Sequence, residues 1–147
     1  MKLLDANLLL YAHTEDLPQH AATRAWIERC FADGDVFGLA WPAVVAFLRL
    51  CTQKGVLLRP STIEAATAMI DGWFASPQVT LVAPGPRHWS LLRHLLAAGQ
   101  GTGNLVPDAH LAALALELDA TLCTNDHGIA RFPGVRLAFP LMSDSGY

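Results

Sequence analysis

The alternation of short apolar segments with longer helical segments most constrains the fold of this chain. The apolar segments have strand length and are expected to form strands at 2–5, 36–39, 79–82, 121–124 and 135–138. Segments with helical patterns separate them, at 17–32, 42–53, 61–75, 86–98 and 107–118. Such alternation favours a parallel sheet with helices on both faces, whose ligands bind beyond the carboxyl ends of the strands. We therefore expect an α/β protein, a doubly wound α/β/α sandwich with a mostly parallel central sheet.

Two local signals refine this prediction. Asp5 closes the first strand and leads into an apolar turn of helix, and Ser61 with Glu64 three residues later has the pattern of a capping box that begins a helix. Gly99 to Asn104 contains three glycines in six residues and is expected to form a flexible loop.

Length and composition indicate a single globular domain over residues 1–147. Apolar residues make up 52% of the chain and charged residues 16%, which supplies ample material for a core. The three cysteines are widely spaced and odd in number, so we expect buried, reduced thiols and neither a disulfide framework nor a zinc site.

Charge and hydropathy limit the partners and the location. The net charge is −3, so a polyanionic partner must be held by a local basic patch or a metal ion, because the overall field does not attract it. Asp5 and Asn7 interrupt the apolar N-terminus, and no run approaches the ~18 apolar residues that span a membrane. We expect a cytoplasmic protein that does not contact the membrane.

Three carboxylates are expected to converge at one edge of the sheet. Asp5 lies at the end of the first strand among leucines, where a buried charge costs several kcal/mol unless it is solvated, paired or bound to a cation. Asp126 follows the strand 121–124, and Asp108 lies in the first turn of a helix behind the glycine loop. Asp108 is also explained as an acid that the helix dipole favours, and Asp126 as a turn former or helix cap.

The convergence of these acids predicts a metal site. Carboxylates that share a site repel one another, and a divalent cation removes the need for some of them to take up protons. Oxygen ligands suit Mg²⁺ or Mn²⁺, which fits metal-assisted hydrolysis of a phosphodiester. Asn7, Thr124 and Asn125 are expected beside the cofactor, where they can hydrogen-bond metal waters or phosphate oxygens.

Other acids and motifs are excluded from this site. Asp119 lies eleven residues beyond Asp108, about 16 Å along a helix, and Glu117 faces the opposite side of that helix. The six histidines show no H-E-x-x-H spacing, which argues against a zinc hydrolase, and His13 and His20 are not expected to be catalytic. The chain also lacks the glycine-rich nucleotide-binding motifs and the G-x-S-x-G of serine hydrolases.

Four segments in order resemble the PIN-domain ribonucleases, specifically the VapC toxins of bacterial toxin-antitoxin pairs. They read LLDANLLLYA, GLAWPAVVAFLRLCT, VPDAHLAALALE and LCTNDHGIARFPGVRL. The resemblance implies a PIN-like fold, a homodimer and a Mg²⁺-dependent endoribonuclease that cleaves structured RNA such as tRNA or an rRNA-like substrate and so inhibits translation. It also implies a VapB-type antitoxin whose C-terminal segment enters the acidic groove, with DNA contacted only through that antitoxin.

Residue by residue, the first, third and fourth acids of the family pattern correspond to Asp5, Asp108 and Asp126. The family usually has a glutamate where this chain has Ala46, so we expect one Mg²⁺ rather than two. By this resemblance Asp5 and Asp108 anchor the ion and Asp126 orients or deprotonates the attacking water. The missing glutamate keeps open an alternative, a PIN fold that has lost catalysis and acts as a binding module.

Two other classes place aspartates at strand ends. A haloacid-dehalogenase-type phosphatase needs a second aspartate two residues after the first, where this chain has Asn7. A receiver-type pocket pairs a lysine with its acids, and the only lysines are Lys2 and Lys54. Both classes are disfavoured.

Overall fold

The computed structural model describes residues 1–142, so residues 143–147 of the predicted domain lie outside the described part. The strands are β1 Lys2–Leu4, β2 Phe37–Ala40, β3 Val79–Val82, β4 Thr121–Cys123 and β5 Leu137–Ala138. The helices are α1 Ala6–His13, α2 His20–Ala32, α3 Trp41–Thr52, α4 Ile63–Phe74, α5 His88–Ala98 and α6 Val106–Leu118. Two short 3₁₀ helices complete the described chain, η1 Gly103–Leu105 and η2 His127–Arg131.

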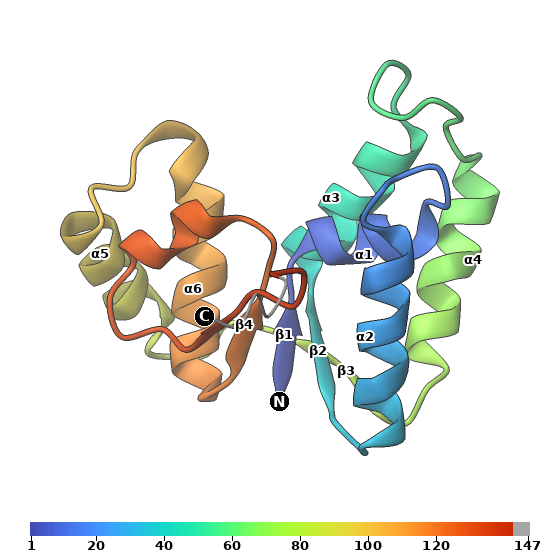
Figure 1. Ribbon diagram of the computed structural model, residues 1–147. Helices are drawn as coiled ribbons and strands as arrows, with labels where there is room; N and C mark the ends of the chain where they lie inside the picture. The colour runs from blue at the N-terminus through green and yellow to red at the C-terminus, as the bar shows by residue number, and fades with distance from the viewer. Residues whose placement is uncertain (143–147) are drawn as a thin grey trace, which may run out of the picture.

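The five strands form one sheet in the order β3-β2-β1-β4-β5, with every neighbouring pair parallel. The chain winds outward from β1 to β3, then crosses to β4 on the other side of β1. Helices α1 to α4 lie on one side of the sheet and α5 and α6 on the other (Figure 1). The expected doubly wound α/β/α sandwich is confirmed, and its order changes direction between β1 and β4, where ligands of such sheets bind.

Alternate residues of the strands supply two separate cores. Leu4 and Cys123 pack on the side of α1 to α4, whereas Leu3 and Leu122 pack on the side of α5 and α6. This alternation follows from the two-residue period of a strand, and it explains why strands covered on both faces are apolar throughout. All three cysteines are buried and free of disulfides, as predicted.

Several element boundaries differ from the prediction. The turn of helix expected after Asp5 is a full helix, Ala6–His13, and the helix expected from residue 17 begins at His20. The prediction of a capping box that begins at Ser61 was wrong. The N-cap of α4 is Thr62, whose Oγ1 accepts a 3.1 Å hydrogen bond from the Ala65 backbone N–H. A polar side chain caps a helix only where the backbone places it within reach of the free N–H groups of the first turn. Ser61 and Thr62 are adjacent hydroxyl residues, so the sequence alone did not show which of them is the cap.

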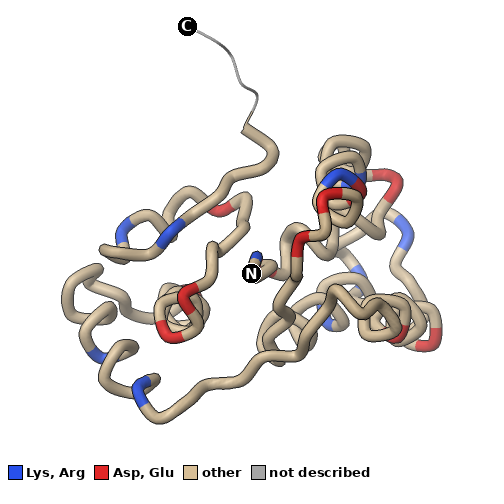
Figure 2. The backbone as a smooth tube through the Cα atoms, turned by 90° about the horizontal axis from the view of Figure 1, so that it is seen from below, with Lys and Arg blue, Asp and Glu red and all other residues tan. Residues whose placement is uncertain are grey.

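Among residues 1–142, the basic side chains are not gathered on one element. In Figure 2, Lys and Arg are spread over separate elements in both halves of the molecule. No helix within residues 1–142 is both long and apolar enough to cross a membrane.

Candidate functional site

The Asp5 carboxylate is fixed at the junction of β1 and α1. One oxygen, Oδ1, accepts a 2.7 Å hydrogen bond from the Ala6 backbone N–H, so Asp5 is the N-cap of α1. The other oxygen, Oδ2, accepts a 2.7 Å hydrogen bond from the Thr124 hydroxyl. Burial raises the pKa of Asp5, the hydrogen bonds from Thr124 and Ala6 oppose the rise, and the charge of Asp126 adds to it.

The segment that follows β4 is tied to the same junction. The Thr124 side chain is fully buried, and its Oγ1 accepts from the Asp126 backbone N–H at 3.0 Å and from the Asn7 amide at 3.2 Å. In return the Asn7 Oδ1 accepts a 3.2 Å hydrogen bond from the Asn125 backbone N–H. One donated and two accepted bonds exhaust the capacity of a hydroxyl, so Thr124 as placed holds Asp5 and Asp126 in register.

Asp108 lies on α6, near enough to Asp126 and Asp5 for their charges to act on it. It lies in the first turn of that helix, which Pro107 helps to begin. Burial raises the pKa of Asp108 to about 6, and the nearby charges of Asp126 and Asp5 contribute to the rise. The exposed Asp126 also caps η2, since its Oδ1 accepts a 2.9 Å hydrogen bond from the Gly128 backbone N–H. The structure therefore brings the three predicted acids near enough to repel one another at the carboxyl edge of the sheet.

The three acids do not form a ready-made set of direct metal ligands. Within residues 1–142, no group of three or more His, Cys, Asp or Glu side chains is arranged so that it could hold a metal ion directly. The donor set nevertheless suits a hard divalent cation, because it consists of carboxylate oxygens whose mutual repulsion such an ion removes. Mg²⁺ usually keeps several of its waters, which bridge to carboxylates that do not reach it.

The acids excluded by helical spacing have other partners. Asp119 is the C-terminal cap of α6, at the opposite end from Asp108, and its Oδ1 lies 3.1 Å from the Arg136 guanidinium. Glu117 accepts hydrogen bonds from the backbone N–H groups of Gly85 and Arg87. Both acids therefore have partners away from the three predicted site acids.

Two features near the acids were not predicted. The Tyr11 hydroxyl accepts a 3.4 Å hydrogen bond from the Asn125 side chain, and the His127 ring stacks on Phe139. Tyr11 and Asn125 are 114 residues apart in the chain. No local pattern links such distant residues, so only the tertiary fold identifies these contacts.

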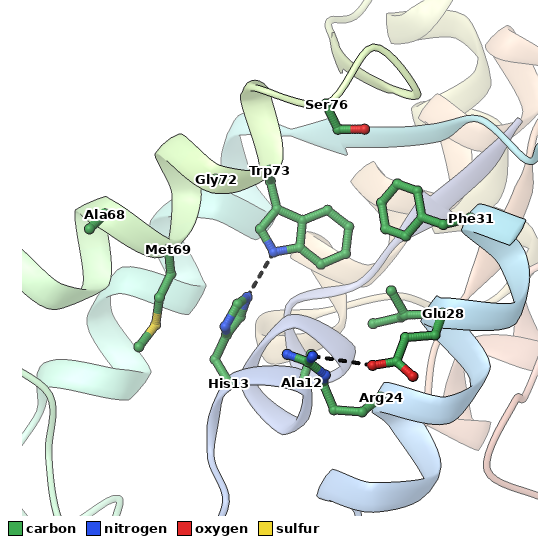
Figure 3. A pocket seen from close by; sticks show the side chains of 11 residues that line it. Ala12, His13, Arg24, Glu28, Phe31, Ala68, Met69, Gly72, Trp73 and Ser76 are labelled. Carbon is green, nitrogen blue, oxygen red and sulfur yellow. Dashed lines mark hydrogen bonds and ion pairs between the residues drawn. The ribbon is translucent and has the colours of Figure 1, made fainter.

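A separate cavity of about 330 Å³ lies between α1, α2 and α4 (Figure 3). Its apolar lining includes Phe31, Met69 and Trp73, and the Trp73 Nε1–H donates a 2.8 Å hydrogen bond to His13 Nε2. Burial lowers the pKa of His13, and the charges of Arg24 and His20 lower it further. His13 thus belongs to this cavity.

Comparisons with known proteins agree with this architecture. The PIN domain family model matches residues 2–135. Ribonuclease VapC37 of Mycobacterium tuberculosis is 42% identical over 137 residues, which cover 92% of this chain and 94% of that protein.

Two solved structures share the fold at lower identity. VapBC2 from Rickettsia felis bound to a promoter DNA fragment gives a TM-score of 0.69 at 16% identity, covering 93% of this chain and 96% of that chain. VapC20 of Mycobacterium tuberculosis, described as a toxin that cleaves the sarcin-ricin loop, gives 0.66 at 14% identity and covers 92% and 99%. The chain belongs to the PIN-domain family and, within it, to the VapC ribonucleases.

Proposed function

We propose that this protein is a metal-dependent endoribonuclease toxin that cleaves structured RNA, such as tRNA or an rRNA-like target, and thereby inhibits translation. The observation that carries the proposal is that Asp5, Asp108 and Asp126 lie near enough at one edge of the sheet for their charges to interact, with the pKa of Asp108 raised to about 6. The relatives' names support ribonuclease activity, and the sarcin-ricin loop cleaved by VapC20 is an example of structured RNA.

The cofactor in this proposal is Mg²⁺, with Mn²⁺ as a substitute. Asp5 and Asp108 hold the ion, in part through water, and Asn7 and Asn125 hydrogen-bond water or phosphate oxygens around it. Because Ala46 supplies no ligand in place of the family glutamate, a single ion is proposed.

The bound cation, Asp126 and Thr124 have different roles in the proposed hydrolysis. A bound divalent cation lowers the pKa of a water nucleophile and stabilises the charge that develops on the phosphate. Asp126, the most exposed of the three acids, orients the attacking water and accepts its proton. Thr124 keeps Asp5 and Asp126 in position through its hydrogen bonds.

The proposed partners are a VapB-type antitoxin and a second copy of the chain. The solved VapBC2 structure, a toxin–antitoxin complex bound to a promoter DNA fragment, supports an antitoxin partner. We propose that this chain contacts DNA only through that antitoxin. Exposed apolar side chains on α3, Trp41 and Val45, supply surface that a homodimer could bury. The activity and its RNA substrates assign the protein to the cytoplasm.

A binding module without catalysis is the second candidate. It is favoured by Ala46, which cannot bind a metal ion, together with the lack of a directly ligating acidic group among residues 1–142.

Cleavage of total RNA by purified protein freed of antitoxin separates the two candidates. We expect cleavage with Mg²⁺, none with EDTA, and at least about 100-fold slower cleavage by Asp5→Asn and Asp108→Asn, because a lost ligand costs more than a lost supporting contact. Asp119→Asn is the matched control and retains activity. Cleavage that persists in EDTA or in both site variants contradicts the mechanism, and no cleavage of any RNA supports the binding module.

A further inference from the structure

The side chain of His127, the residue that follows Asp126 in the chain, lies flat against the ring of Phe139. The ring centroids are 4.2 Å apart and the planes are inclined by only 10°. His127 immediately follows Asp126 in the chain, and it is exposed to solvent. One face of the imidazole is therefore covered by Phe139, while the residue as a whole remains exposed.

The backbone and the supporting ring are held in place. Asp126 caps the turn that carries His127 through its bond to the Gly128 N–H, and Ile129 in the same turn is 1% exposed. Phe139 is partly buried against the core between the sheet and α6. An exposed side chain ordinarily keeps its rotamer freedom, and stacking on a fixed ring removes much of that freedom before any ligand binds.

We propose that His127 and Phe139 form a platform on which an unpaired RNA base stacks next to the scissile phosphate. This inference rests on the proposed function and adds a substrate feature, an unstacked nucleotide in a loop, bulge or single strand. Proteins recognise RNA by stacking such bases on aromatic rings and histidine, whereas bases within a helix are already stacked. Because His127 adjoins Asp126 in the chain, the stacked base belongs to a nucleotide that borders the cleavage site.

Stacking makes the platform tolerant of sequence. Every base has a π face, so the platform selects nucleotides that are unpaired rather than one particular base. The shape of the RNA around the cut then matters more than the identity of the stacked base.

Binding of oligoribonucleotides to the Asp108→Asn protein tests the platform without cleavage. The probe is a single-stranded RNA with 2-aminopurine, a fluorescent base whose emission is quenched on stacking, placed at successive positions. We expect quenching at one position, and loss of that quenching with roughly tenfold weaker binding when His127→Ala is added. His127→Phe retains the quenching, because a phenyl ring also stacks. His94→Ala, a change at an exposed histidine on α5, has no effect.

Three results would overturn the platform: unchanged protein-induced quenching in His127→Ala, loss of this quenching in His127→Phe as complete as in His127→Ala, or equal additional quenching on protein binding when the same RNA is fully paired. Thermal unfolding of each variant shows that it is folded. Failure of the proposed function is distinguishable, since it is measured as the lack of Mg²⁺-dependent cleavage by the unmodified protein. If the protein cleaves RNA but the quenching does not depend on His127, only the platform is contradicted. If the quenching depends on His127 but the protein does not cleave RNA, only the proposed ribonuclease activity is contradicted.

Discussion

The Thr124 hydroxyl and the Asp5 carboxylate are joined by a 2.7 Å hydrogen bond that spans 119 positions of the chain. It links the ends of the parallel neighbours β1 and β4, the point at which the sheet order reverses. The same hydroxyl accepts from the Asp126 backbone N–H, so one fully buried side chain fixes two of the three acids.

Replacement of Thr124 by valine tests this link. Valine has a similar shape but removes the hydroxyl that donates to Asp5 Oδ2 and accepts from the Asp126 backbone N–H, while the Ala6 N–H still donates to Asp5 Oδ1. We expect RNA cleavage to fall about 10- to 100-fold and the free energy of unfolding to fall by about 1–3 kcal/mol. Thr124→Ser keeps the hydroxyl and retains most of the activity in the same cleavage and urea-unfolding measurements. Equal activity of the valine and serine variants would show that the hydroxyl does not position the acids.

The raised pKa of Asp108 predicts how metal binding depends on pH. Asp108 must be ionised to hold a cation, so Mg²⁺ affinity falls as the pH drops through about 6. Thermal stabilisation by Mg²⁺ should accordingly be larger at pH 7.5 than at pH 5.5. A Mg²⁺ effect that is the same at both pH values contradicts this prediction.

Without a metal ion, the raised pKa of Asp108 makes the folded protein less stable at neutral pH than at low pH. The Asp108 pKa in the folded protein lies above its usual value of 3.8, so its stabilising effect is present at low pH and is lost as the pH rises through about 6. Asp108→Asn should therefore raise the free energy of unfolding in EDTA at pH 7.5 by on the order of 1 kcal/mol, after allowance for partial solvent screening. The gain should shrink toward pH 4, as measured by urea unfolding.

The lowered pKa of His13 predicts that the folded protein loses stability at acidic pH. Its pKa is lowered by burial, so its contribution to stability is present above about 6.5 and is lost as the pH falls below that value. Protonation also removes the acceptor for the Trp73 indole N–H. His13→Gln keeps an acceptor that does not titrate, and it should reduce the stability lost between pH 7.5 and 5.5, as measured by urea unfolding at both pH values. His94→Gln is the control, and an identical pH dependence in wild type and His13→Gln refutes the assignment.

Much of the fold and the set of acids could be predicted because both depend on local patterns. Asp5 and Asp126 follow strands, and parallel strands bring their carboxyl ends to one edge, so their proximity follows from fold class alone. Asp108 is identified by its position in the first turn of a helix. The boundaries were less accurate, as at Thr62, where neighbouring hydroxyl residues compete to cap the helix.

The supporting contacts depend on residues far apart in sequence and were beyond local reasoning. Thr124 was expected near the cofactor, but its partners Asp5 and Asn7 determine that it holds the acids. The stack of His127 on Phe139 likewise depends on where the chain runs after β5.

In cells, the proposed toxin should act when its antitoxin is absent. Expression of the chain alone should arrest growth and reduce incorporation of labelled amino acids, because cleavage of translation RNA stops protein synthesis. Asp108→Asn at the same soluble level should not. Normal growth with verified soluble wild-type protein is the outcome that contradicts the toxin assignment.

The central claim is that Asp5, Asp108 and Asp126 share one divalent cation. Crystals soaked in Mn²⁺ and measured at the manganese absorption edge test it most directly, since anomalous scattering locates the ion itself. We predict one peak per chain between the three carboxylates, about 2.1 Å from each directly bound oxygen and farther from any bound through water. Crystals that show no peak at this edge of the sheet, or a peak only at another surface, would contradict the account.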